Sequence, residues 1–136
     1  MKIENFREKI EETSRDFYNF RESFNSSQNE FFIRKSCFHI TQRCVQREIQ
    51  AKTIFKAFNI LHDKKLLKKG NTSVLCSNKI TFVYSVRGNK IQFLTCYNGE
   101  SKWDIEKNQI NLKISRIDHF VYYFKKNLKN NWRLMW

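Results

Sequence analysis

Residues 80–97 read ITFVYSVRGNKIQFLTCY, and this stretch decides the fold class. Apolar, β-branched and aromatic side chains recur at about every second position over 80–86 and again over 90–97. This is the period of a strand that is covered on one face. Arg87-Gly88-Asn89 separates the two runs, and a short turn that contains glycine is a common hairpin connection. The stretch therefore predicts two antiparallel strands.

The chain before this hairpin has the period of helices instead. Over residues 3–24, apolar side chains recur at spacings of three, four and seven, with Glu and Arg between them, which predicts an amphipathic helix. Residues 38–48, and then a segment that ends near Asp63, are expected to form a helix-turn-helix-like pair or one bent helix. We therefore expect an α+β fold in which N-terminal helices pack on one face of an antiparallel sheet.

Length and element order set the expected domain organisation. The chain has 136 residues, which is about one ordinary domain. We expect a single domain over 1–136, with a helical part over 1–63 and an antiparallel sheet part over 73–124. Besides the hairpin, the sheet part is expected to hold a short strand at 74–76, an alternating run at 110–115 and a β-rich run at 120–124.

The sequence also predicts the cellular compartment of the protein. No apolar run approaches the roughly 18 residues of a membrane-spanning helix, and residues 1–12 are charged, without the apolar stretch of a secretory signal. The four cysteines occur singly, with no C-x-x-C pair, a pattern typical of reduced structural thiols rather than of a disulfide framework or a zinc knuckle. They are Cys37, Cys44, Cys76 and Cys96. We predict a cytoplasmic protein with no membrane partner.

The charge is unevenly distributed along the chain. The 26 Lys and Arg against 13 Asp and Glu give a net charge of +13. Residues 1–63 hold 11 basic and 9 acidic side chains, a net +2, and residues 64–136 hold 15 and 4, a net +11. A concentrated basic field favours a polyanion such as RNA as the partner, and the alternative is a solvated lysine-rich surface.

Two classes of phosphate chemistry are excluded by what the sequence lacks. There is no G-x-x-x-x-G-K-[ST] or G-x-G-x-x-G motif, and the chain has only three glycines, so no nucleotide-driven chemistry is expected. The basic half has four carboxylates and no cluster of them for Mg²⁺. We expect no cofactor and no metal.

The densest polar grouping is HITQRCVQREI, residues 39–49. On a helix, His39, Arg43 and Arg47 are four residues apart and project from one stripe. Metal-free cleavage of RNA requires a group that takes the 2′-OH proton and cations that stabilise the charged phosphate of the transition state. Histidine titrates near neutral pH, and arginine binds phosphate through two donors. The alternative is that both arginines pair with Glu48 and its neighbours, while His39 fills a surface position.

This segment resembles the H-x-x-x-R-x-x-Q-R-E-I segment of the RegB family of phage endoribonucleases. It is similar, more loosely, to a pattern of the RelE and barnase-like small ribonuclease toxins. The match covers mainly residues 37–61. The resemblance implies N-terminal helices followed by an antiparallel sheet, with His39 and Arg43 catalytic and Arg47 a phosphate or structural contact. Asn59 stands where the RegB family has a second histidine, which leaves the acid–base pair incomplete.

Further candidates come from other parts of the chain. His62 and His119 are each considered as the second proton-transfer group, and Thr95 and Tyr97 share one strand face that could present hydroxyls to a phosphate or ribose. The expected contacts to the RNA backbone are Lys65, Lys68, Arg87, Lys90 and Arg116.

Three function classes follow from these features. The first is a metal-independent endoribonuclease that cuts single-stranded RNA or mRNA, including ribosome-associated mRNA, by 2′-OH attack and leaves a cyclic phosphate. The second is an RNA-binding regulator of the same fold without catalysis. The third is a phage- or toxin-type protein that acts on a host protein or has a cognate acidic inhibitor.

Overall fold

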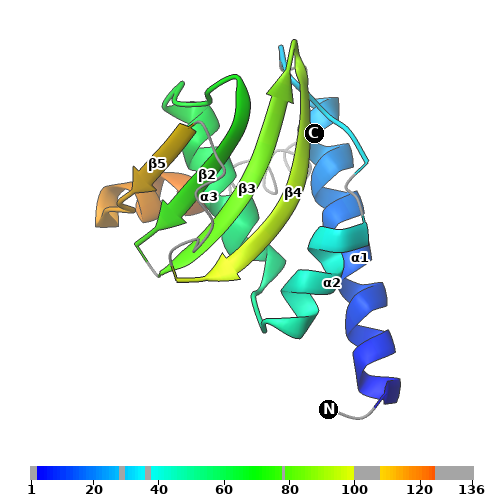
Figure 1. Ribbon diagram of the computed structural model, residues 1–136. Helices are drawn as coiled ribbons and strands as arrows, with labels where there is room; N and C mark the ends of the chain where they lie inside the picture. Colours follow the sequence, from blue (N-terminus) through cyan, green and yellow to red (C-terminus); the bar gives the residue numbers. More distant parts are fainter. Residues whose placement is uncertain (1–2, 28–29, 36–37, 78, 100–107, 125–136) are drawn as a thin grey trace, which may run out of the picture.

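The predicted hairpin forms the centre of a five-stranded sheet (Figure 1). The computed structural model describes residues 3–27, 30–35, 38–77, 79–99 and 108–124. Strands β3 (Ile80–Arg87) and β4 (Lys90–Asn98) are antiparallel, and their turn contains Gly88 at φ 63°. Glycine adopts this left-handed conformation without the strain that a side chain would cause. The hairpin is confirmed.

A β-bulge interrupts the hairpin ladder. Val83 pairs with Thr95, but the next residue, Tyr84, pairs with Phe93, so Leu94 is the extra residue on β4. An extra residue bends its strand and strengthens the local twist. The side chains of Phe93 and Cys96 consequently both face the core, although three positions separate them.

The sheet is mixed rather than wholly antiparallel. β2 (Gly70–Cys76) pairs antiparallel with β3, but β5 (Asn108–Leu112) runs parallel to β2, and β1 (Phe32–Ile33) runs parallel to β4. The strand order is β1-β4-β3-β2-β5. The α+β fold class is confirmed, while the expectation of an antiparallel sheet holds only for its three central strands. Alternation of side chains predicts a strand but not the direction of its partner.

Three helices lie on one side of the sheet (Figure 1): α1 (Ile3–Ser26), α2 (Phe38–Gln46) and α3 (Ala51–Asp63). α2 and α3 are separate helices, and Glu48 between them has a φ of 54°. The Asn25 side chain exchanges two hydrogen bonds with the backbone of Ile33, at 2.8 and 2.9 Å. This exchange fixes the end of α1 beside β1, a strand that lies within the part of the chain expected to be helical.

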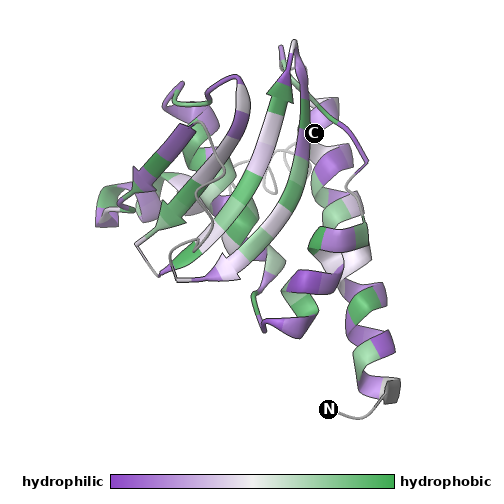
Figure 2. Cartoon of the chain, viewed as in Figure 1, coloured by the Kyte–Doolittle hydropathy of each residue, from purple (hydrophilic) through white to green (hydrophobic). Residues whose placement is uncertain are grey.

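Phenylalanine rings from the helices and the sheet make up the core. Phe17 and Phe20 of α1 meet Phe55 of α3 with ring centroids 5.0 and 4.3 Å apart, and Phe58 of α3 meets Phe93 of β4 at 5.2 Å. Figure 2 shows green apolar bands separated by paler ones along β3 and β4, and Phe82, Tyr84 and Phe93 of these strands belong to this core. Each fully buried ring contributes about 1.5–3 kcal/mol to stability.

The prediction of a β-rich run at 120–124 is wrong, because residues 116–124 form a helix. Ser115 and Asp118 begin it. The backbone N–H of Asp118 donates to Ser115 Oγ at 3.1 Å, and the backbone N–H of Ser115 donates to Asp118 Oδ2 at 3.0 Å. This reciprocal capping box satisfies donors that a helix N-terminus leaves unpaired. It outweighs the β propensity of the aromatic residues that follow.

In the part of the chain that the structure describes, no helix combines the length and the apolar character needed to cross a lipid bilayer.

Candidate functional site

His39 and Arg43 are in contact on the outer side of α2. Arg43 Nε donates a hydrogen bond to His39 Nε2 at 3.3 Å, and Arg43 Nη1 donates to Gln46 Oε1 at 2.8 Å. Since His39 Nε2 accepts this bond, the proton of the neutral ring is on Nδ1. His39 and Arg43 of the predicted stripe therefore contact each other, and Gln46 orients the Arg43 guanidinium.

Arg47 continues the stripe and crosses to the sheet. Its backbone N–H still donates to Arg43 O at 2.9 Å, one residue after α2 ends. Its Nη1 donates to the backbone oxygen of Cys96 at 2.6 Å, and its guanidinium carbon lies 5.0 Å from the centroid of the Tyr97 ring. Asn98 Nδ2 donates to Arg47 O at 2.8 Å. Arg47 thus connects α2 to β4, and its expected contact with phosphate stays a prediction.

The environment of His39 favours its neutral form. Burial, followed by the positive charges of Arg43 and Arg47, lowers the pKa of His39 from the ordinary value of 6.5. A neutral imidazole can accept a proton, whereas an imidazolium cannot. His39 is nevertheless largely exposed on the surface of α2. It is an accessible base with a cation beside it.

Thr95 and Tyr97 lie on one face of β4, as predicted. They pair with Val83 and Thr81, while Cys96 between them faces the helices. Tyr97 is joined to the stripe through the stacked Arg47. The Tyr97 ring therefore lies beside Arg47, at the end of the stripe.

The other two histidines of the chain have different surroundings. The ring of His62, near the end of α3, packs against Phe24 at 5.1 Å and Phe31 at 6.0 Å, and its Nδ1 lies 3.8 Å from Asp63 Oδ1. His119 is hydrogen-bonded to Lys56 Nζ. α3 does run through His62, which is required if His62 is to act as the second proton-transfer group in place of Asn59. The contacts of His62 and His119, however, link neither histidine to the stripe.

The predicted backbone contacts are distributed over three places. Arg87 and Lys90 pair across the hairpin turn, about 23 Å along β4 from Tyr97 at the usual rise per strand residue. Lys65 and Lys68 lie in the connection between α3 and β2, and Arg116 lies in the 116–124 helix. A Lys64–Asp118 ion pair of 2.9 Å brings that connection and that helix together. The structure does not join these cations to the α2 stripe.

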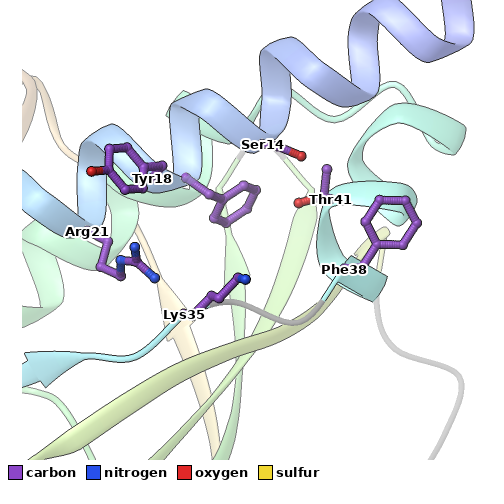
Figure 3. A pocket seen from close by; sticks show the side chains of 7 residues that line it. Ser14, Tyr18, Arg21, Lys35, Phe38 and Thr41 are labelled. Carbon is purple, nitrogen blue, oxygen red and sulfur yellow. The ribbon is translucent and has the colours of Figure 1, made fainter.

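Reasoning from the sequence missed a pocket between α1 and the start of α2. Its volume is about 270 Å³. Figure 3 shows Arg21 and Lys35 close together at one end, and Phe38 at the other. The pocket is lined by Ser14, Phe17, Tyr18, Arg21, Lys35, Phe38 and Thr41. Residues 1–30 hold 5 basic and 7 acidic side chains, so their composition does not predict an anion site, although none of the residues that line the pocket is acidic.

Over the described residues, no three His, Cys, Asp or Glu side chains gather where they could hold a metal ion. Cys44, Cys76 and Cys96 are buried free thiols, and Cys37 lies outside the described residues. The fold and the site together define an α+β protein whose second helix presents a histidine–arginine stripe beside a strand. No protein-family model, curated protein or solved structure matches the chain.

Proposed function

We propose that the protein is a metal-independent endoribonuclease that cleaves single-stranded RNA or mRNA and leaves a 2′,3′-cyclic phosphate. The observation that carries the proposal is the 3.3 Å contact between Arg43 Nε and His39 Nε2. This contact of an imidazole with a guanidinium supports the pairing of a base with a cation that can bind phosphate. The likeness of residues 39–49 to the RegB segment and the net charge of +13 also support it.

The reaction assigns one role to each side chain. His39 Nε2 takes the proton of the 2′-OH, and the 2′-oxygen attacks the phosphorus while the bond to the 5′-oxygen breaks. Arg43 turns its Nε from His39 to the phosphate and stabilises the charge that develops there. Water supplies the proton for the leaving 5′-oxygen. Arg47 keeps α2 in place through Cys96 and Tyr97.

The reaction is tested with purified protein and single-stranded RNA in EDTA. We expect cleavage products that end in a cyclic phosphate, and a loss of about 10²–10⁴-fold in rate for His39→Ala and a large loss for Arg43→Leu. Arg15→Leu, an exposed arginine of α1 outside the stripe and the pocket, serves as the matched control and retains the wild-type rate. Intact RNA with the wild-type protein, or equal rates for all variants, rejects the proposal.

A second candidate is an RNA-binding regulator without catalysis. The observation that favours it is the placement of His62 against Phe24 and Phe31, together with that of His119 against Lys56. Neither histidine supplies a second proton-transfer group at His39. Tight, salt-dependent binding with recovery of intact RNA would select this candidate.

We place either activity in the cytoplasm. The three described cysteines support this placement, since all are free thiols and free thiols are typical of a reducing compartment.

A further inference from the structure

The pocket between α1 and α2 is lined by aromatic rings and by cationic and hydroxyl side chains. Its floor is apolar, with Phe17 5% exposed, while the rings of Tyr18 and Phe38 at its sides are 55% and 59% exposed. Exposed aromatic rings at the mouth of a pocket leave apolar surface in water, and a flat ligand stacked on them would cover it. The shape and the rings therefore favour a planar apolar group.

The cations of the pocket favour an anionic group beside it. Arg21 lies 5.2 Å from the Tyr18 ring centroid, and its ion pair with the exposed Glu22 has a separation of 3.5 Å. An exposed ion pair of this kind is weak, so the guanidinium remains able to bind an anion. Lys35 shows no ion pair among the described residues, and Gln92 Nε2 fixes its backbone oxygen at 3.3 Å.

Hydroxyl groups provide the remaining polar contacts. The Ser14 and Thr41 side chains come from α1 and α2 and project into the space between the two helices (Figure 3). They can donate to or accept from the edge of a ring. A volume of about 270 Å³ is just below the usual range of roughly 300–1,000 Å³ for small-molecule sites, so the pocket suits one ring with its attached groups.

The pocket and the catalytic stripe are on the same short helix. Phe38 is the residue before His39, and Thr41 lies two residues before Arg43. The two surfaces are thus separated by no more than the thickness of one helix, about 10–12 Å with side chains. A single strand that crosses α2 can contact both.

We propose that the pocket binds one unpaired base of the RNA whose scissile phosphate lies at His39 and Arg43. The base stacks on Phe38, its edge faces Ser14 and Thr41, and the adjoining phosphate contacts Lys35 and Arg21, which lies beside Tyr18 at the other end of the pocket. Stacking on aromatic side chains is the common means of binding unpaired bases. The inference rests on the proposed function for the identity of the RNA, and it makes single-stranded RNA the required substrate form.

Binding is measured by fluorescence anisotropy with a short labelled single-stranded RNA, in the His39→Ala background so that no cleavage interferes. We expect Phe38→Ala to weaken binding roughly 5- to 100-fold, as for the loss of one stacked base. Phe120→Ala, which removes a ring that is 69% exposed in the 116–124 helix, is the matched control and leaves the affinity unchanged. Because the Phe38 ring is exposed, its removal is expected to leave folding intact.

Two further measurements distinguish the contribution of the pocket's cations to binding from that of its aromatic ring. Lys35→Ala should lower the slope of log affinity against log salt by about one. Inorganic polyphosphate, which has the charge but no bases, should bind the Phe38→Ala variant as well as it binds the parent. Equal losses for RNA and polyphosphate, or for Phe38→Ala and Phe120→Ala, overturn the inference.

The two proposals fail in different ways. If the wild-type protein leaves RNA intact but Phe38→Ala still weakens RNA binding selectively, the catalytic proposal is rejected and the base pocket stands. If RNA is cleaved but Phe38→Ala binds it unchanged, the base pocket is rejected and the catalytic proposal stands.

Discussion

The thiol sulfurs of Cys44 and Cys96 lie 3.6 Å apart in the core, although 52 residues separate them in the chain. Cys44 follows Arg43 on α2, and Cys96 precedes Tyr97 on β4. The contact between the two sulfurs therefore connects α2, the helix of the proposed site, to the strand beside it. The hydrogen bond to Cys96, followed by burial, raises the pKa of Cys44, which keeps it a thiol at neutral pH.

Replacing Cys44 tests whether this contact positions the stripe. Cys44→Ala leaves a small cavity between α2 and β4, and we expect a loss of about 1–2 kcal/mol in the free energy of unfolding, measured by urea denaturation. Cys76→Ala, at a buried thiol of β2, should cost a similar amount. Only the Cys44 variant should also change the NMR titration of His39. Equal effects of both variants on that titration would contradict the positioning role.

Removal of Arg47 should lower the stability of the protein, whereas removal of Arg43 should lower its activity. Arg47→Ala loses a charge-assisted hydrogen bond to a backbone oxygen and the stacking on Tyr97, so the free energy of unfolding should fall by about 1.5–3 kcal/mol. Arg43 contacts His39 and Gln46 of the same helix, so Arg43→Ala should stay within about 0.5 kcal/mol of the wild type.

Urea denaturation measures both stabilities, and RNA cleavage measures the activity. A folded and stable Arg43→Ala protein with wild-type activity would contradict the assignment of the phosphate contact. A stability of Arg47→Ala equal to that of the wild type would contradict the role of Arg47 as a connection between helix and strand.

The pH dependence of cleavage follows from the lowered pKa of His39. The base acts when it is neutral, so activity should rise with pH through a midpoint below 6.5, the ordinary histidine value. Arg43→Leu removes a positive charge that opposes protonation, so the NMR titration midpoint of His39 should move upward in this variant. A midpoint that moves downward, or one that lies above 6.5 in the wild type, would contradict this account.

His39 also affects stability through the same shift. Because its pKa is lower in the folded than in the unfolded protein, the unfolded chain binds the proton more readily as the pH falls. The contribution of neutral His39 to stability is therefore full above pH 6.5 and is lost as the pH falls toward the folded-state pKa. In His39→Ala this dependence disappears, which urea denaturation at several pH values would detect.

The capping box of the 116–124 helix gives a prediction about local stability. Ser115→Ala removes the acceptor for the Asp118 N–H and should destabilise the helix by about 1 kcal/mol, seen as faster hydrogen exchange of the His119 amide. The hydrogen bond from the Ser115 N–H, together with that from Lys64, lowers the pKa of Asp118. The stabilisation by ionised Asp118 is therefore present at neutral pH and is lost in acid. Ser23→Ala, at an exposed serine of α1, is the control.

Local patterns in the sequence predicted the parts of the fold that depend on near neighbours. Alternation and the Gly88 turn were sufficient for the β3–β4 hairpin, and the heptad-like spacing of apolar residues was sufficient for α1. β1 has only two residues and no period to recognise, and β5 joins β2 from a distant part of the chain. Ser115 and Asp118 have the spacing of a helix cap, but the aromatic run after them has the composition of a strand, so local propensity predicts the wrong element there.

The same distinction applies to the site. The His39, Arg43 and Arg47 stripe could be predicted because helical spacing alone aligns it. The contact of Arg47 with Cys96 spans 49 residues, and the pocket combines side chains of α1 and α2, so both depend on tertiary packing.

The hydrogen bond from Arg47 to Cys96 has a consequence for solubility. β1 covers the outer edge of β4 only at Lys90 and Ile91, and no other described strand lies along that edge. An uncovered edge invites a strand of another molecule to pair with it and so promotes aggregation. Arg47 occupies one backbone acceptor there and places a positive charge beside it, so the residue that connects α2 to β4 also discourages self-association of the sheet.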